Sequence, residues 1–182
     1  MERILNLAQE IGFTTAAPLN MEALVFRTEV RDMCAADRCL SYSRNWSCPP
    51  ACGTPDVCTR RMEGFRRGVL VQTTGAMEDD FDAETIGETY LRHKRNFEAL
   101  ARQTRLLHPD CLPLTAGACT LCRKCTYPDR PCRFPKKRLS SMEAYGLLVS
   151  EVCVRSGVPY NHGPRTITYT SCILFDQKGE PP

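Results

Sequence analysis

The cysteines constrain this chain more than any other feature. The sequence of 182 residues contains twelve, and ten of them form two dense groups, five within residues 34–58 and five within residues 111–132. Such a density is typical of a disulfide framework in a small secreted protein or of metal ligation in a reducing compartment. The chain is long enough to bury a core without covalent staples, and cysteines spaced by two intervening residues favour ligation. We therefore expect two metal sites.

The start of the chain favours the reducing compartment. It reads Met-Glu-Arg-Ile with Glu10 close behind, which is not a signal peptide. No apolar run approaches the ~20 residues of a membrane span. Apolar residues make up 42% and charged residues 25% of the chain, which is typical of a globular protein and excludes a disordered one. We expect a cytoplasmic protein without membrane association, in which the isolated Cys153 and Cys172 are buried thiols.

The hydrophobic pattern predicts a single α+β domain over residues 1–176 and a loose tail over 177–182. Helical periodicity and capping signals predict helices over 2–11, 55–65, 83–107 and 140–155. In the last of these, Ser140 and Glu143 have the spacing of a capping box. Short apolar or β-branched runs predict strands over 23–26, 68–74, 111–117 and 166–175. We expect a small, mostly antiparallel sheet of three or four strands, with helices on one face. Two irregular cysteine-rich loops, one of them over 31–55, would project from it.

The second cysteine group has the more specific spacing. Three of its cysteines follow one another with two residues between them, and a fourth follows the third with six residues between them: Cys119, Cys122, Cys125 and Cys132. This arrangement presents thiolates to adjacent irons of a cube, as in bacterial [4Fe–4S] proteins, although there the last interval is shorter. A mononuclear zinc site more often pairs two Cys-x-x-Cys knuckles across a longer loop. We expect a [4Fe–4S] cluster here, with zinc as the alternative.

The first cysteine group is more widely spaced. Cys34, Cys39 and Cys48 are the firm candidate ligands, and the two prolines after Cys48 stiffen the chain that leaves it. The fourth candidate is Cys52 or Cys58. Because Cys58 falls on the predicted helix over 55–65, Cys52 is preferred. This group is expected to hold a second [4Fe–4S] cluster, and the alternatives are a zinc-stapled loop and a reactive thiol pair.

The segment 123–138 is strongly basic, with seven Lys or Arg residues against Asp129 alone. Positive side chains around a cluster stabilise its reduced state, and on the surface they attract an acidic partner. Nucleic acid is not favoured, because the segment has no interleaved aromatic residues and no known motif.

Five motifs together resemble a known family. They are Cys34-x₄-Cys39-x-x-Tyr42, Asn45-Trp46-Ser47-Cys48-Pro49-Pro50, Ala116-Gly117-x-Cys119-x-x-Cys122-x-x-Cys125, Pro131-Cys132-Arg133-x-Pro135 and Ser141-Met142-Glu143-Ala144-Tyr145-Gly146. The chain resembles an uncharacterised prokaryotic family of predicted metal-binding proteins with a domain of unknown function. The resemblance implies cysteine-ligated metal, iron–sulfur in the first place, in proteins common among anaerobes, and no established reaction. The family's first motif has three cysteines before Pro-Pro, which implies a remote fourth ligand or an iron open to an external ligand.

These patterns lead to one main functional hypothesis. We expect a two-cluster iron–sulfur protein that transfers single electrons to or from a redox partner protein with an acidic docking surface. The alternatives are a cluster-dependent enzyme or reductive activator with an open iron, and a zinc-binding structural or interaction protein. No catalytic residue is assigned, because the chain has no phosphate-binding loop, Rossmann fingerprint or Gly-x-Ser-x-Gly elbow.

Overall fold

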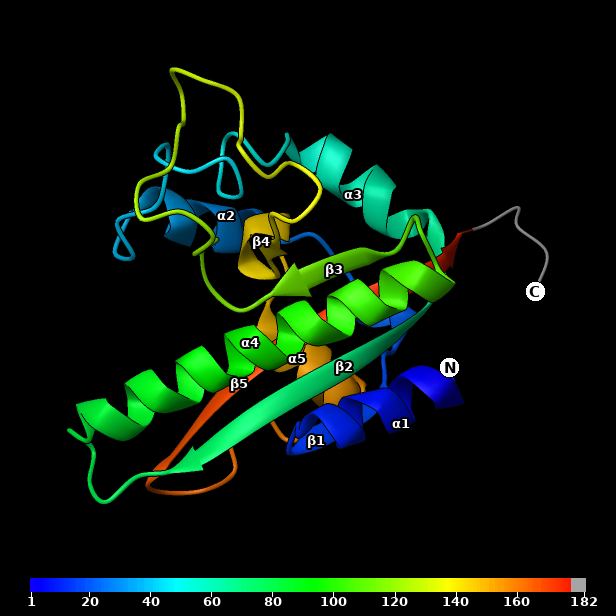
Figure 1. Ribbon diagram of the computed structural model, residues 1–182, viewed down its shortest axis with the longest axis vertical. Helices are drawn as coiled ribbons and strands as arrows, with labels where there is room; N and C mark the ends of the chain where they lie inside the picture. The colour runs from blue at the N-terminus through cyan, green and yellow to red at the C-terminus, as the bar shows by residue number, and fades with distance from the viewer. Residues whose placement is uncertain (178–182) are drawn as a thin grey trace.

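A long antiparallel strand pair forms the centre of the molecule. The computed structural model describes residues 1–177, and within that range five strands form one mixed sheet in the order β1-β2-β5-β3-β4 (Figure 1). The strands are β1 (Thr15–Pro18), β2 (Phe65–Ala76), β3 (Leu112–Thr115), β4 (Ser140–Ser141) and β5 (Thr166–Gln177). Neighbouring strands are antiparallel except β3 and β4, which are parallel. The predicted α+β class with a mostly antiparallel sheet is confirmed, with more strands than expected.

Side chains of β2 and β5 alternate between two hydrophobic layers. Val71 and Ile173 belong to one layer, whereas Leu70 and Cys172 belong to the other. This alternation follows from the period of two of a β-strand. Cys172 and Cys153 are both fully buried, as predicted.

Two helices cover the first face of the sheet, α1 (Glu2–Ile11) and α4 (Ala83–Leu107) (Figure 1). Both have the predicted bounds. The helix α4 begins where predicted because the Asp82 carboxylate accepts a hydrogen bond from the Thr85 amide at 2.9 Å. Within its apolar stripe, Phe97 and Leu100 are fully buried against the sheet and α1.

Shorter helices cover the second face, so the expectation of helices on one face was incomplete. This layer includes residues of α3 (Pro55–Glu63), α5 (Val149–Arg155), η1 (Met21–Ala23) and η2 (Glu143–Tyr145). A further helix, α2 (Thr28–Ala35), packs against η2. Leu70, Cys172 and Leu174 of the two long strands point toward this layer and are fully buried, which is why it needs a cover of its own.

Three local expectations were wrong. Residues 23–26 form no strand, because the Asn20 side chain caps η1 by accepting from the Glu22 amide at 2.9 Å. The segment 31–55 is not wholly irregular, because α2 runs through Ala35. The expected tail began one residue too early, since Gln177 ends β5; the rest of it lies outside the described residues.

The predicted helix over 140–155 begins later than expected. Ser140 pairs with Leu114 in β4 and caps no helix. The chain then turns at Gly146, where φ is +71° and an added Cβ would lie 2.6 Å from the Phe26 ring. This close approach requires glycine, and the helix starts only at Val149.

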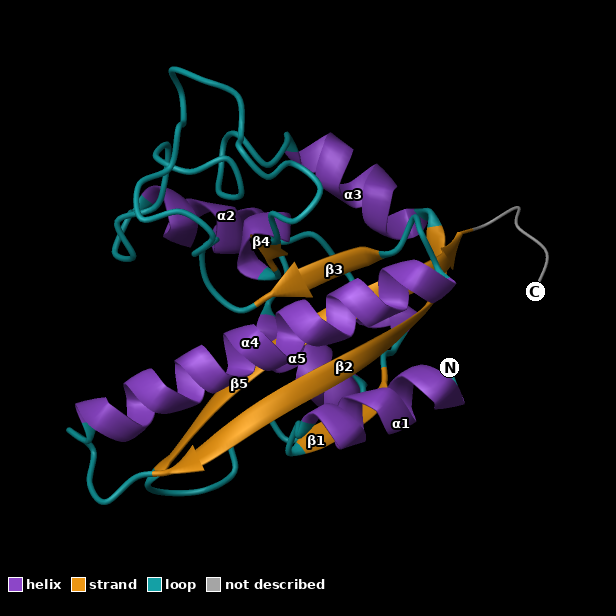
Figure 2. Cartoon of the chain, viewed as in Figure 1, coloured by secondary structure: helices purple, strands orange, loops and turns teal. Residues whose placement is uncertain are grey.

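The two cysteine-rich loops lie together beyond the β3–β4 edge of the sheet (Figure 2). One, residues 36–54, connects α2 to α3, and the other, residues 116–139, connects β3 to β4. Parallel neighbours need a crossover connection, which is usually helical, but here it is irregular throughout. Within residues 1–177, no helix is long and apolar enough to cross a membrane.

Candidate metal centre

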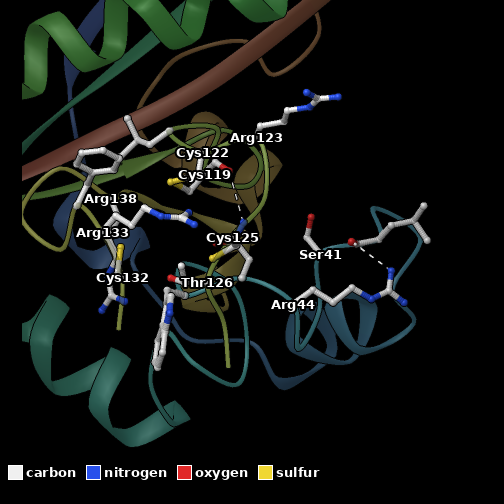
Figure 3. A pocket seen from close by; sticks show the side chains of 15 residues that line it. Ser41, Arg44, Cys119, Cys122, Arg123, Cys125, Thr126, Cys132, Arg133 and Arg138 are labelled. Atoms are coloured by element: carbon white, nitrogen blue, oxygen red, sulfur yellow. Dashed lines mark hydrogen bonds between the residues drawn. The ribbon is translucent and has the colours of Figure 1, made fainter. Parts of the chain in front are cut away.

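All four cysteines of the second group line one cavity. It has a volume of about 200 Å³, and Cys119, Cys122, Cys125 and Cys132 are all in its wall. Figure 3 shows them with the basic side chains of the same loop, of which Arg123 extends away from the thiols. The spacing in the sequence therefore brings these four thiols to one place.

The loop's own hydrogen bonds shape this cavity. The Thr126 hydroxyl donates to the Pro131 carbonyl at 2.9 Å, and the Arg130 amide donates to the Thr126 carbonyl at 3.0 Å. The Arg133 guanidinium donates to the Lys124 carbonyl at 2.9 Å. These contacts fold the interval between Cys125 and Cys132 into an arc, so that both thiols face one space.

Three cysteines of the first group line a second cavity, of about 350 Å³. Cys34 reaches it from the last turn of α2, and Cys39 and Cys48 reach it from the loop that follows. Tyr42 and Glu143 also line it. These three cysteines are the ones that the family's first motif shares.

Cys52 and Cys58 form a separate pair. The two thiols hydrogen-bond to each other, and an Arg31 nitrogen lies 3.9 Å from the Cys52 sulfur and 3.8 Å from that of Cys58. The hydrogen bond from Cys52 and the Arg31 charge lower the pKa of Cys58 to about 7. Cys52 lines a different depression, together with Arg61 and Tyr145. The structure thus places the preferred fourth ligand beside Cys58, and its thiol also contacts the carbonyl of Ala144, which lines the cavity of Cys34.

One side chain joins the two cavities. The Ser47 hydroxyl accepts from the Cys119 amide at 3.2 Å and lies 3.8 Å from the Cys48 sulfur. The Asn45 amide group donates to the Cys119 carbonyl at 3.4 Å. Cys48 and Cys119, one from each group, are therefore close neighbours.

The first loop also covers the second cavity. The Trp46 indole donates to the Arg130 carbonyl at 3.0 Å, and its ring meets that of Tyr127 edge-on at 5.0 Å. The Arg138 guanidinium lies over Trp46 at 5.9 Å. Trp46 is thus part of the wall around Cys119 and its partners.

The cysteines of the second group lie apart in the wall of their cavity. In the part of the chain that the structure describes, no three Cys, His, Asp or Glu side chains form a group that could hold one metal ion. Zinc requires its sulfurs about 2.3 Å from one point, whereas the thiolates of a cluster bind separate irons.

The comparison with protein families gives one match. A family model described as "Predicted metal-binding protein (DUF2284)" matches residues 17–175. The chain belongs to the DUF2284 family. No curated protein and no solved structure matches it. The match confirms the resemblance carried by the motifs, and both cavities of this DUF2284 protein lie within the matched residues.

Burial keeps several of these thiols protonated in the metal-free protein. It raises the pKa of Cys34, where the charge of Glu143 adds to the effect, and that of Cys48 to about 11. Burial also raises the pKa of Cys119, although hydrogen bonds from the Leu121 and Leu139 amides oppose it. Because metal binds thiolates, loading this DUF2284 protein should release protons.

Lys94, on α4, is a part of the site that sequence reasoning missed. Its buried ammonium donates to the carbonyls of Ala116 at 3.2 Å and Ala118 at 3.0 Å, just before Cys119. Burial lowers the pKa of Lys94, while the charges of Cys119 and other acidic groups raise it. The signal was present: Lys94 lies four residues after Tyr90 and three before Phe97, on the apolar stripe of the helix.

The three histidines of the chain have other partners. His93 is fully buried and hydrogen-bonds to Thr73 at 2.9 Å and Ser171 at 2.7 Å. His162 hydrogen-bonds to the Gln72 side chain at 2.9 Å, and His108 pairs with Asp176 at 2.9 Å. The candidate donors at the two cavities are therefore sulfur and oxygen atoms.

Proposed function

We propose that this DUF2284 protein holds two [4Fe–4S] clusters and transfers single electrons to or from a redox partner. The observation that carries the proposal is the pair of adjoining cysteine-lined cavities. Cys119, Cys122, Cys125 and Cys132 would hold one cluster, and Cys34, Cys39 and Cys48 would supply three ligands to the other. When bound, each cluster supplies one-electron redox chemistry.

The contact between the cavities supports passage of electrons between the two sites. Ser47 lies within 3.8 Å of the Cys48 sulfur and 3.2 Å of the Cys119 amide. This short chain of contacts leaves no solvent gap between one candidate ligand of each site. Lys94 contributes a positive charge that would favour the reduced state of a cluster beside Cys119.

The basic second loop supports an acidic docking partner. Its exposed cations belong to the same loop as Cys132, which is only partly buried, and two of them, Arg123 and Arg133, line the cavity. These cations are Arg123, Lys124, Arg130, Arg133, Lys136 and Lys137. A partner with a negative surface would be steered to this loop, and the docked complex would place the partner close to the second site.

The proposal is tested by metal and sulfide analysis of protein purified without oxygen. Two [4Fe–4S] clusters predict about eight irons and about eight acid-labile sulfides per chain, with visible absorbance that bleaches on addition of dithionite. About two zincs with no sulfide and no colour would refute it and would establish the structural zinc alternative.

The first cavity favours a second candidate function. It is lined by three cysteines, and a cluster held by three thiolates leaves one iron for another ligand. A cluster-dependent enzyme or reductive activator would use that iron to bind a small molecule. The two functions differ in whether the protein itself supplies the fourth ligand.

A further inference from the structure

An unpaired carboxylate belongs to the first cavity. Glu143 lines this cavity together with Cys34, Cys39 and Cys48. Among the described residues, its Oε2 atom is one of two buried side-chain oxygen or nitrogen atoms with no hydrogen-bond partner. A buried carboxylate oxygen without a donor is costly, so its presence beside three thiols indicates a missing positive partner such as a metal.

Contacts with Cys34, Ser141 and Phe26 fix the backbone around Glu143. The Cys34 thiol lies 3.9 Å from the Glu143 carbonyl, which places the two residues on the same wall. The Ser141 hydroxyl accepts from the Ala144 amide at 3.0 Å, and Gly146 turns the chain where Phe26 leaves no room for a side chain. The carboxylate is thus presented by a fixed turn and not by a mobile loop.

The other candidates for the fourth ligand fit less well. Cys52 hydrogen-bonds to Cys58, and its thiol donates to the Ala144 carbonyl at 3.5 Å. Tyr42 also lines the cavity, but its hydroxyl is not among the buried atoms of the described residues that have no hydrogen-bond partner. Glu143 offers a carboxylate oxygen ligand without any rearrangement of the Cys52–Cys58 pair.

We propose that the carboxylate of Glu143 is the fourth protein ligand of the first cluster, which is then held by Cys34, Cys39, Cys48 and Glu143. This inference rests on the proposed function and makes it more specific. A carboxylate is a harder ligand than a thiolate and suits iron–sulfur chemistry less well. The iron bound to Glu143 is therefore the one that an external ligand would bind most easily. The same cluster could then transfer electrons and also bind a small molecule at this iron.

The test compares Glu143→Gln, Glu143→Cys and Cys52→Ser with the unaltered protein, all purified without oxygen. The readouts are iron and sulfide per chain and the EPR spectrum after reduction. Glu143→Gln should lower iron from about eight to about four per chain, with the signal of the second cluster retained as an internal sign of folding. Glu143→Cys should keep the full iron content with an altered signal from the first cluster. Cys52→Ser should match the unaltered protein.

Two results would overturn the assignment of Glu143. One is full iron with an unaltered EPR spectrum in both Glu143 variants, and the other is loss of the first cluster in Cys52→Ser. If Glu143→Gln does not fold, Glu143→Cys decides alone, because a thiolate ligand must change the spectrum if position 143 binds iron. Failure of the proposed function looks different, since the unaltered protein would then contain no iron or sulfide.

Discussion

The hydroxyl of Ser47 accepts a hydrogen bond from the amide of Cys119 at 3.2 Å, although the two residues belong to different loops. Ser47 is fully buried, and its position is set locally by the Asn45 side chain, which accepts from the Ser47 hydroxyl at 2.8 Å. The two candidate sites are thus parts of one structure.

Replacing Ser47 should weaken both loops together. In Ser47→Ala the Cys119 amide loses its acceptor, and a buried donor left unpaired costs about 1–3 kcal/mol. We expect a lower free energy of unfolding in urea and faster loss of iron to a chelator. The control is Thr14→Val, which removes a hydrogen-bonded hydroxyl at the opposite edge of the sheet, far from both loops. Equal chelation rates in the two variants would show that Ser47 does not join the sites.

Removing the charge of Lys94 should make the clusters harder to reduce. The buried ammonium lies next to the chain that leads to Cys119, and a positive charge stabilises the reduced state. Lys94→Met should lower the potential by an amount on the order of 50 mV, or about 1 kcal/mol for one electron. EPR-monitored titration measures this, and Arg95→Met, an exposed neighbour on α4, should cause little change. Equal shifts in both variants would contradict a specific role for Lys94.

Fluorescence should report the state of the second site. The chain has one tryptophan, and Trp46 lines the cavity of the second cysteine group. A coloured iron–sulfur cluster there would quench its emission, so removal of iron should raise the emission severalfold. Cys122→Ser should already have high emission, whereas Cys39→Ser should stay largely quenched because the second cluster remains. Emission that does not respond to iron would mean that no such cluster lies beside Trp46.

Acid should destabilise the fold through His93. Burial, with a smaller effect from the charge of Lys94, lowers its pKa to about 3, whereas an unfolded histidine titrates near pH 6.5. Between these values the unfolded chain binds more protons. The contribution of His93 is therefore fully present above pH 6.5 and is lost as the pH falls toward 3, by up to ~1.4 kcal/mol per pH unit. Urea unfolding from pH 7.5 to 4.5 should show a shallower dependence in His93→Gln than in the unaltered protein. Parallel curves would contradict the prediction.

Sequence reasoning succeeded where the signal was local. Gly12 follows α1 in the left-handed conformation, Thr54 and Pro55 start α3, and Asp82 caps α4. Each of these depends on a few consecutive residues, so the helix limits could be predicted. The second group of cysteines was equally visible, because its short spacing leaves the thiols little freedom to separate.

It failed where distant residues decide the outcome. Ser140 pairs with Leu114, and Gly146 is required by Phe26, which lies 120 residues earlier in the sequence. The position of Cys52, in the turn before α3, depends in part on its contact with Arg31 of α2. No local pattern records such contacts, and for the same reason Glu143 was read only as part of a helix cap.

Trp46 and Ser47 of the first loop complete the surroundings of Cys119 and Cys132 in the second loop. The shape of the second site therefore depends on the first loop. A substitution in the first loop that changes the shape of its own site also changes the second site, so natural selection acts on its effect at both. The two cysteine motifs should therefore be inherited together and lost together among descendants of this chain, while the exposed helix surfaces are free to diverge.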